Sequence, residues 1–231
     1  MGSEALAARL LKDSEEQPML KDFVARCLDS MRWGGSVVLM VVDASFTSSG
    51  LSYFTAVVPR VLRFKEEQVD LGRVRELREL PGLPLEVKLR YWRNRRSWLV
   101  ADEVAARLSR LEAPDDRARL RAWASASRLE GWRDDLVGSV KGVGLVTYQY
   151  LRMMGGVDTA MPDRIVKRYV YSAGKEAGVD VPLDDVEFVK FLERLRDLYG
   201  VSPVAVTWLS WLRLSEGDDV LSRYRELLHL L

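Results

Sequence analysis

The chain has 231 residues, of which 48% are apolar, enough to bury a core without disulfides or structural metals. Its single cysteine, Cys27, and single histidine, His229, exclude an internal disulfide framework, an iron-sulfur cluster held by its own thiolates, a histidine metal site and a histidine-based triad. The 35 Lys and Arg residues oppose 34 acidic residues, so bulk charge points to no class of partner.

Membrane and export signals are missing from the pattern. No run of apolar residues approaches the length of a membrane-spanning helix, and charge begins at Glu4 rather than after an apolar leader. We therefore expect a cytoplasmic protein without a membrane partner. One asparagine and three glutamines beside 30% charged residues indicate a thermophilic prokaryote.

Helical periodicity runs along the whole chain, because apolar residues recur three and four positions apart in nearly every long segment. The predicted fold class is all-α. Helices are predicted over residues 4–12, 18–31, 35–47, 50–64, 69–78, 86–110, 115–127, 132–140, 145–154, 161–176, 185–198, 203–214 and 218–229. The β-branched run 37–42 has no partner strand, so a central buried helix is the favoured interpretation.

A turn of sequence Lys141-Gly142-Val143-Gly144 separates two of these predicted helices. Glycine lets the backbone turn without a side-chain clash and exposes N–H groups at the start of the following helix. Those groups and the helix dipole favour a phosphate ligand. The same turn is also an ordinary helix connection when it occurs alone.

The hairpin and the residues after it resemble a known signature. Residues 134–147, followed by Asp163, Val166 and Arg168, are similar to the hairpin and aspartate of the helix-hairpin-helix DNA glycosylase superfamily, which includes endonuclease III and 3-methyladenine glycosylase. Asp158 lies too close to the hairpin to be that aspartate, and we assign it to a turn. Upstream, residues 43–47 are more weakly similar to the family's Ala-Gln-x-Thr segment, with serine in the glutamine position.

The resemblance implies a fold of two helical subdomains around a DNA-binding cleft, within a single unit of residues 1–231. The first subdomain would span about residues 35–130, the hairpin and aspartate about 131–176, and the second subdomain residues 1–34 with 177–231. Double-stranded DNA is the implied partner, with no metal or other cofactor, and the protein would be nucleoid-associated. A monomer is expected because DNA already occupies one face.

The resemblance also implies an activity. Asp163 would be the catalytic carboxylate, stabilising positive charge on the deoxyribose as the N-glycosidic bond breaks. Val146 stands where strand-cutting members carry a nucleophilic lysine, which implies a monofunctional glycosylase. Lys141 to Gly144 would grip DNA phosphates. Arg164 and Lys167 flank Asp163 and would either bind DNA or lower the pKa of that carboxyl.

Base removal needs a wedge that fills the gap in the stack and an aromatic pocket that receives the base. Phe46 is the candidate wedge. The candidate pocket residues are Trp33, Tyr148, Gln149, Tyr150 and Trp211. Aromatic residues at helical spacing are also typical of an ordinary core, and the basic-aromatic run 88–98 either binds phosphate or solvates a helix face.

Two alternatives stay open. A bifunctional glycosylase would use Lys141 as the nucleophile, and a non-catalytic, structure-specific DNA-binding protein would use the same scaffold without removing a base. A cleft with no room for a nucleoside beside Asp163 would favour the second alternative.

Overall fold

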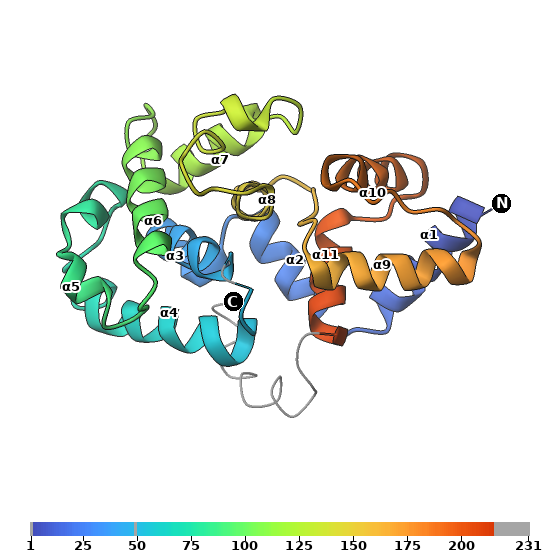
Figure 1. Ribbon diagram of the computed structural model, residues 1–231, viewed down its shortest axis with the longest axis horizontal. Coiled ribbons are helices and arrows are strands. Elements are labelled where there is room, and N and C mark those ends of the chain that lie inside the picture. The colour runs from blue at the N-terminus through green and yellow to red at the C-terminus, as the bar shows by residue number, and fades with distance from the viewer. Residues whose placement is uncertain (1, 49, 215–231) are drawn as a thin grey trace.

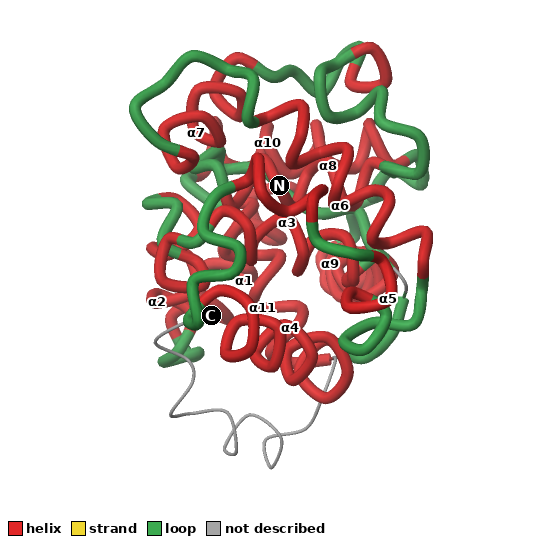
Figure 2. The backbone as a smooth tube through the Cα atoms, turned by 90° about the vertical axis from the view of Figure 1, so that its left-hand side faces the viewer, coloured by secondary structure: helices red, strands yellow, loops and turns green. Residues whose placement is uncertain are grey.

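The computed structural model describes residues 2–48 and 50–214, and within these ranges every regular element is helical (Figure 1, Figure 2). The predicted all-α class is confirmed; the predicted helix 218–229 lies outside the described residues. The α-helices are α1 Gly2–Glu15, α2 Leu20–Leu28, α3 Val37–Thr47, α4 Val58–Phe64, α5 Leu85–Lys88, α6 Arg95–Leu108, α7 Asp116–Ala126, α8 Leu145–Met154, α9 Arg164–Ala177, α10 Asp185–Tyr199 and α11 Pro203–Leu214. Short 3-10 segments are η1 Arg32–Gly35, η4 Leu77–Gly82 and η5 Trp132–Asp134, and π segments are η2 Tyr53–Val57 and η3 Lys65–Val69.

The helices pack in two groups. In one, α3 contacts α4, α6, α7 and α8; in the other, α1, α9 and α10 surround α11. Helix α2 contacts both α8 and α11 and so connects the groups. Figure 1 shows α3 to α7 on the left, α9 to α11 on the right, and α8 with α2 between them.

Helix α3 forms the centre of the first group, and all of its residues are buried. Ser36 caps its start by accepting the Leu39 N–H at 3.4 Å. A helix without a polar face must be covered on all sides, which explains why four other α-helices pack around it. The prediction of a central buried helix is confirmed.

The predicted helix 86–110 is divided in the structure. Helix α5 ends at Lys88, and Asn94 starts α6 by accepting the Arg96 N–H at 2.9 Å and the Ser97 N–H at 3.4 Å. Asparagine at a helix start satisfies N–H groups that have no partner inside the helix. The cap therefore fixes where the second helix begins.

Two other helix predictions are wrong. Residues 70–76 form turns, with Gly72 at φ +69°, and Glu76 and Glu79 form a capping box that starts η4 instead. Residues 132–140 contain only η5 and turns, so the segment before the hairpin is not an α-helix. There Asp135 accepts the Val137 N–H at 2.8 Å and closes a turn. Local side-chain hydrogen bonds to the backbone compete with helix formation.

Candidate functional site

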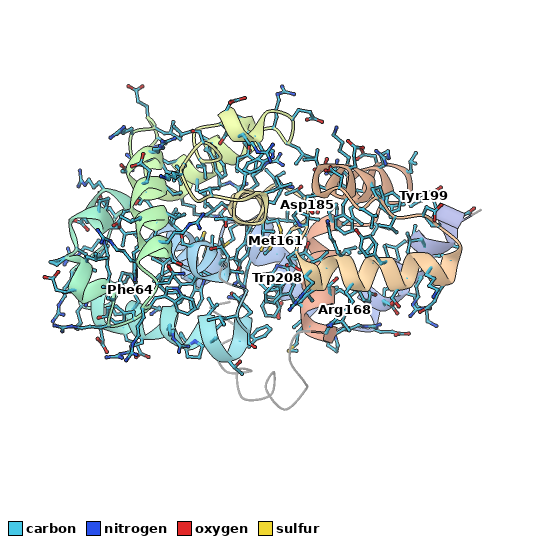
Figure 3. The ribbon with its side chains drawn as sticks, in the orientation of Figure 1. Phe64, Met161, Arg168, Asp185, Tyr199 and Trp208 are labelled. Atoms are coloured by element: carbon cyan, nitrogen blue, oxygen red, sulfur yellow. The ribbon has the colours of Figure 1, made fainter. Side chains whose placement is uncertain are left out.

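A cleft of about 560 Å³ opens where the hairpin faces the starts of α6 and α9. This volume lies within the roughly 300–1,000 Å³ typical of small-molecule sites, so the cleft has the volume for a nucleoside. The residues used below that line it are Thr47, Gly50, Asn94, Arg96, Gly142, Gly144, Val146, Asp163, Arg164 and Asp185. Asp185 lies near the middle of the molecule, close to where the two helix groups meet (Figure 3). The structure therefore brings the predicted hairpin and the predicted aspartate to one cleft.

Asp163 is the N-cap of α9. Its Oδ1 accepts the backbone N–H groups of Ile165 at 2.7 Å and Val166 at 2.9 Å. Its Oδ2 accepts the indole N–H of Trp211 at 2.8 Å. Each carboxylate oxygen has two lone pairs, so Oδ2 keeps one acceptor position, and Asp163 lines the cleft. The residue predicted as catalytic thus has a structural task and a spare acceptor.

Burial raises the pKa of Asp163 above its ordinary value, and the hydrogen bonds from Val166, Trp211 and Ile165 oppose that rise. Within the described residues no cation forms an ion pair with this carboxylate. Arg164 follows it directly but is exposed on the cleft wall. A carboxylate without a paired cation is held mainly by N–H dipoles, and an approaching positive charge meets it uncompensated.

The segment that presents Asp163 is fixed by buried polar contacts. Gln149 on α8 donates to the Thr159 hydroxyl at 2.7 Å and to the Ala160 carbonyl at 3.1 Å. Arg152 donates to Gln149 Oε1 at 2.8 Å, which satisfies the other end of the amide. The sequence predicts Gln149 as a pocket residue; the structure places it in the core, where it holds the chain leading to Asp163.

Asp158 has a different role from the predicted local turn. Its Oδ1 accepts the Ser202 hydroxyl at 2.8 Å and the Val204 N–H at 3.0 Å. It therefore secures the start of α11, the helix that carries Trp211. Asp158 does not line the cleft, which agrees with its exclusion as the catalytic candidate.

The hairpin glycines differ in what they require. Gly142 has φ +102°, and a Cβ there would lie 2.9 Å from Val100 Cγ2, so only glycine fits. Gly144 caps α8 at φ −100°, and a Cβ added there would meet no described atom within 4 Å beyond its chain neighbours. Because glycine has no side chain to cap the helix, the first N–H groups of α8 have no side-chain acceptor at the N-cap. Val143 is buried and anchors the turn, while Lys141 is exposed.

The predicted phosphate-binding cations divide into two kinds. Arg164 is exposed on the cleft wall, as is Arg96, which belongs to the basic-aromatic run 88–98. Lys167 instead forms an ion pair with Asp185 and donates to the Leu183 carbonyl at 2.8 Å. An ion pair of this kind must break before the ammonium binds another anion, so Arg96 is the better placed cation.

The predicted wedge must be corrected. Phe46 is completely buried and stacks on Trp92 with ring centroids 4.5 Å apart and an interplanar angle of 7°. A side chain packed in this way cannot enter a base stack. Leu51, in contrast, is 52% exposed and follows Gly50, which lines the cleft.

The predicted pocket aromatics also need correction. Trp33 and Tyr148 are core residues: the indole of Trp33 donates to Asp43, and the hydroxyl of Tyr148 donates to the Arg128 carbonyl. Tyr150 and Trp211 border an apolar gap of about 10 Å³ that also contacts Tyr53, Met161 and Trp208. Met161 and Trp208 lie near the middle of the molecule (Figure 3). Thr47 lines both this gap and the cleft.

A buried polar network behind the gap was missed in the sequence. Asp43 Oδ2 accepts from Trp33 at 2.8 Å, Tyr150 at 2.8 Å, Tyr53 at 3.0 Å and Arg32 at 3.3 Å. Its Oδ1 accepts the Thr47 hydroxyl at 3.1 Å. The signal was present, since an acidic residue inside a fully apolar helix must be paired.

Among the described residues, no helix is both long and apolar enough to span a bilayer, and no group of three His, Cys, Asp or Glu side chains is arranged as metal ligands. Comparisons of the chain with protein-family models, with curated proteins and with solved structures found no match.

Proposed function

We propose that the protein is a monofunctional DNA glycosylase, which hydrolyses the N-glycosidic bond of a damaged or mispaired base. One observation carries the proposal: the Asp163 carboxylate and the uncapped start of α8 at Gly144 line the same cleft, which has the volume for a nucleoside. Backbone N–H groups hold a phosphate at such a position. A nucleotide whose phosphate is held there would place its sugar in the cleft that Asp163 also lines.

Asp163 supplies charge stabilisation. The C1′–N bond breaks with its electron pair leaving on the base, and positive charge develops on the sugar. A water oxygen then bonds to C1′, and the proton of that water ends on the released base. Asp163 lines the cleft, and the acceptor position that Trp211 leaves on Oδ2 would orient the water, while the two N–H bonds to Oδ1 keep the carboxylate fixed.

Val146 and Leu51 define the rest of the reaction. Val146 lines the cleft in the position of the family's lysine, and Lys141 does not line it, which supports hydrolysis without strand cleavage. Leu51 takes the wedge role in place of Phe46, because its aliphatic side chain is exposed and it follows Gly50, which lines the cleft. Two helical groups around this cleft, with the hairpin on one wall, form the DNA-binding architecture we propose.

The test is base release from a panel of duplexes carrying uracil, alkylated, oxidised and mispaired bases. Asp163→Asn should lower the rate by roughly 100-fold or more, the usual size of such a contribution, while duplex binding stays nearly unchanged. Asp185→Asn is the matched control, since Asp185 also lines the cleft but is paired with Lys167.

Three outcomes decide between the alternatives. Base release by Asp163→Asn at the wild-type rate sinks the proposed role of Asp163. Duplex binding without release of any base supports the non-catalytic DNA-binding protein, for which the helix-capping contacts of Asp163 would be its whole task. A borohydride-trapped adduct that disappears in Lys141→Ala supports the bifunctional alternative.

A further inference from the structure

A second groove, of about 830 Å³, lies next to the cleft. Asn94 lines both, and Leu51 borders the groove while its neighbour Gly50 borders the cleft. We call this feature the arginine groove, after the four arginines that line it, Arg60, Arg63, Arg90 and Arg93. The two hollows therefore meet at the ridge formed by Leu51 and Asn94.

The charge of the arginine groove is unbalanced. All four arginines are exposed, and no acidic residue is among the residues that line it. Glu67 pairs with Arg63 at 2.8 Å, whereas the guanidinium groups of Arg90 and Arg93 form no hydrogen bond or ion pair within the described part of the chain. Basic and acidic residues are nearly equal in number over the whole chain. The arginine cluster is therefore a local feature and does not follow from an overall excess of basic residues.

The walls of the groove are rigid. Trp92 is held by its stack on Phe46, and the Tyr91 hydroxyl accepts from Gln68 at 2.6 Å and donates to Glu67 at 2.8 Å. The guanidinium of Arg60 lies 5.4 Å from the centre of the Trp92 ring, and that of Arg63 lies 5.6 Å from the Tyr91 ring. Cation-π contacts of this kind place the charges in advance of any ligand.

We propose that the arginine groove binds the phosphate backbone of DNA on the far side of the Leu51 ridge from the hairpin. Several exposed arginine forks lining one groove suit a chain of phosphates, and they read no sequence. Assigning the groove in this way rests on the proposed function, because it assumes that the damaged nucleotide occupies the cleft. The basic-aromatic run 88–98 then acts through Arg90 and Arg93, while Tyr91 and Trp92 form the wall.

The experiment measures duplex binding by fluorescence anisotropy over a series of salt concentrations. The variant is Arg60→Ser/Arg90→Ser/Arg93→Ser, which leaves the Arg63–Glu67 pair intact. Each lost phosphate contact lowers the slope of log affinity against log salt by about 0.9, so the slope should fall by about 2 to 3. The affinity for damaged and undamaged duplexes should fall by the same factor, at least about 10-fold at low salt.

A charge-matched control is Arg110→Ser/Arg128→Ser/Arg194→Ser. These three arginines are exposed and line neither the cleft nor the groove, so the salt slope should stay at the wild-type value. Circular dichroism of both triple variants checks that each is folded. Uncharged methylphosphonates, placed one at a time in the duplex, should weaken the wild type but not the groove variant at the phosphates that the groove contacts.

The outcomes separate this proposal from the proposed function. An unchanged salt slope in the groove variant, with base release intact in the wild type, overturns the groove and leaves the glycosylase standing. Absence of base release, with the expected loss of slope, supports the groove and overturns the glycosylase. Binding of polyglutamate by the wild type that is lost in the groove variant, with DNA affinity unchanged, assigns the groove to an acidic protein and overturns the proposal.

Discussion

Two regions of this molecule each hold a carboxylate in a web of hydrogen bonds, yet they are built for different ends. Around α3, Asp43 is completely buried and accepts from five side chains, one of which is the cation Arg32. At the cleft, Asp163 accepts from three N–H groups and pairs with no cation among the described residues. The two carboxylates therefore differ in charge compensation and in access to the cleft.

The largest expected effect concerns the Asp43 network. Asp43→Asn leaves the buried Arg32 guanidinium without its counter-charge, which should lower the free energy of unfolding by about 3–5 kcal/mol. Asp163→Asn should lower it by less than about 1 kcal/mol, because asparagine also caps helices well. Denaturant unfolding followed by tryptophan fluorescence measures both. Equal losses of unfolding free energy in the two variants would contradict the difference between the two regions.

A second effect concerns the proton affinity of Asp163. Trp211→Phe keeps an aromatic side chain beside the gap and removes the indole donor that opposes the rise in the pKa of Asp163. A hydrogen bond to a charged group is worth about 1.5–3 kcal/mol, so the pKa should rise further, by about 1 or more. Carboxyl carbon NMR titration reports this directly. An unchanged or lowered pKa of Asp163 in this variant would mean that the indole does not stabilise the ionised carboxylate.

A smaller effect is expected in how the free energy of unfolding depends on pH. Burial raises the pKa of Asp163 above its ordinary value of 3.8 in an unfolded chain, so the stabilisation from tighter proton binding is complete below pH 3.8 and is lost as pH rises through the folded-state pKa. Asparagine does not titrate. The stability of Asp163→Asn relative to the wild type should therefore rise from acid to neutral pH, by about 1.4 kcal/mol for each pH unit between the two pKa values.

Unfolding of the two proteins in parallel over that pH range provides the measurement. Other titrating groups, such as Asp13, are common to both proteins and cancel in the difference. A difference in stability that is flat with pH, or that falls toward neutral pH, would contradict the raised pKa.

The smallest change in stability is expected at the exposed wedge. Leu51→Ala should alter the free energy of unfolding by less than about 0.5 kcal/mol, whereas Phe46→Ala, in the α3 region, should cost about 3–5 kcal/mol. Single-turnover base release by Leu51→Ala should fall roughly 10-fold, equivalent to about 1.4 kcal/mol, since less apolar surface fills the opened stack. Full base release by Leu51→Ala would remove it from the wedge role.

Several elements followed from local pattern. The apolar run of α3 and the glycine pair that ends α8 predicted both helices, because burial and helix termination act over a few residues. The predictions for 69–78 and 132–140 failed where Gly72 and the Asp135 side chain close turns in place of helical hydrogen bonds. Spacing alone does not reveal such competition.

The site divides in the same way. Hairpin and aspartate spacing identified residues that line one cleft, whereas the partner of Asp163, Trp211, is 48 residues away in the chain. Phe46 and Trp33 were assigned wrongly, because the sequence pattern around an aromatic residue is the same whether its side chain faces the core or a ligand. Arg60 and Arg63 join the run 88–98 only through tertiary packing, so the sequence indicated only the half of the arginine groove that Arg90 and Arg93 contribute.

The position of Trp211 has a thermodynamic consequence. One indole both donates its N–H to Asp163 and borders the small gap beside Tyr53 and Trp208. Any group that widens the gap and turns the ring also withdraws the donor, and the carboxylate then holds protons more tightly. By linkage the reverse holds with equal strength: protonation of Asp163 changes the affinity of the gap for its occupant by the same factor. Occupancy of the gap and protonation of Asp163 are therefore thermodynamically coupled.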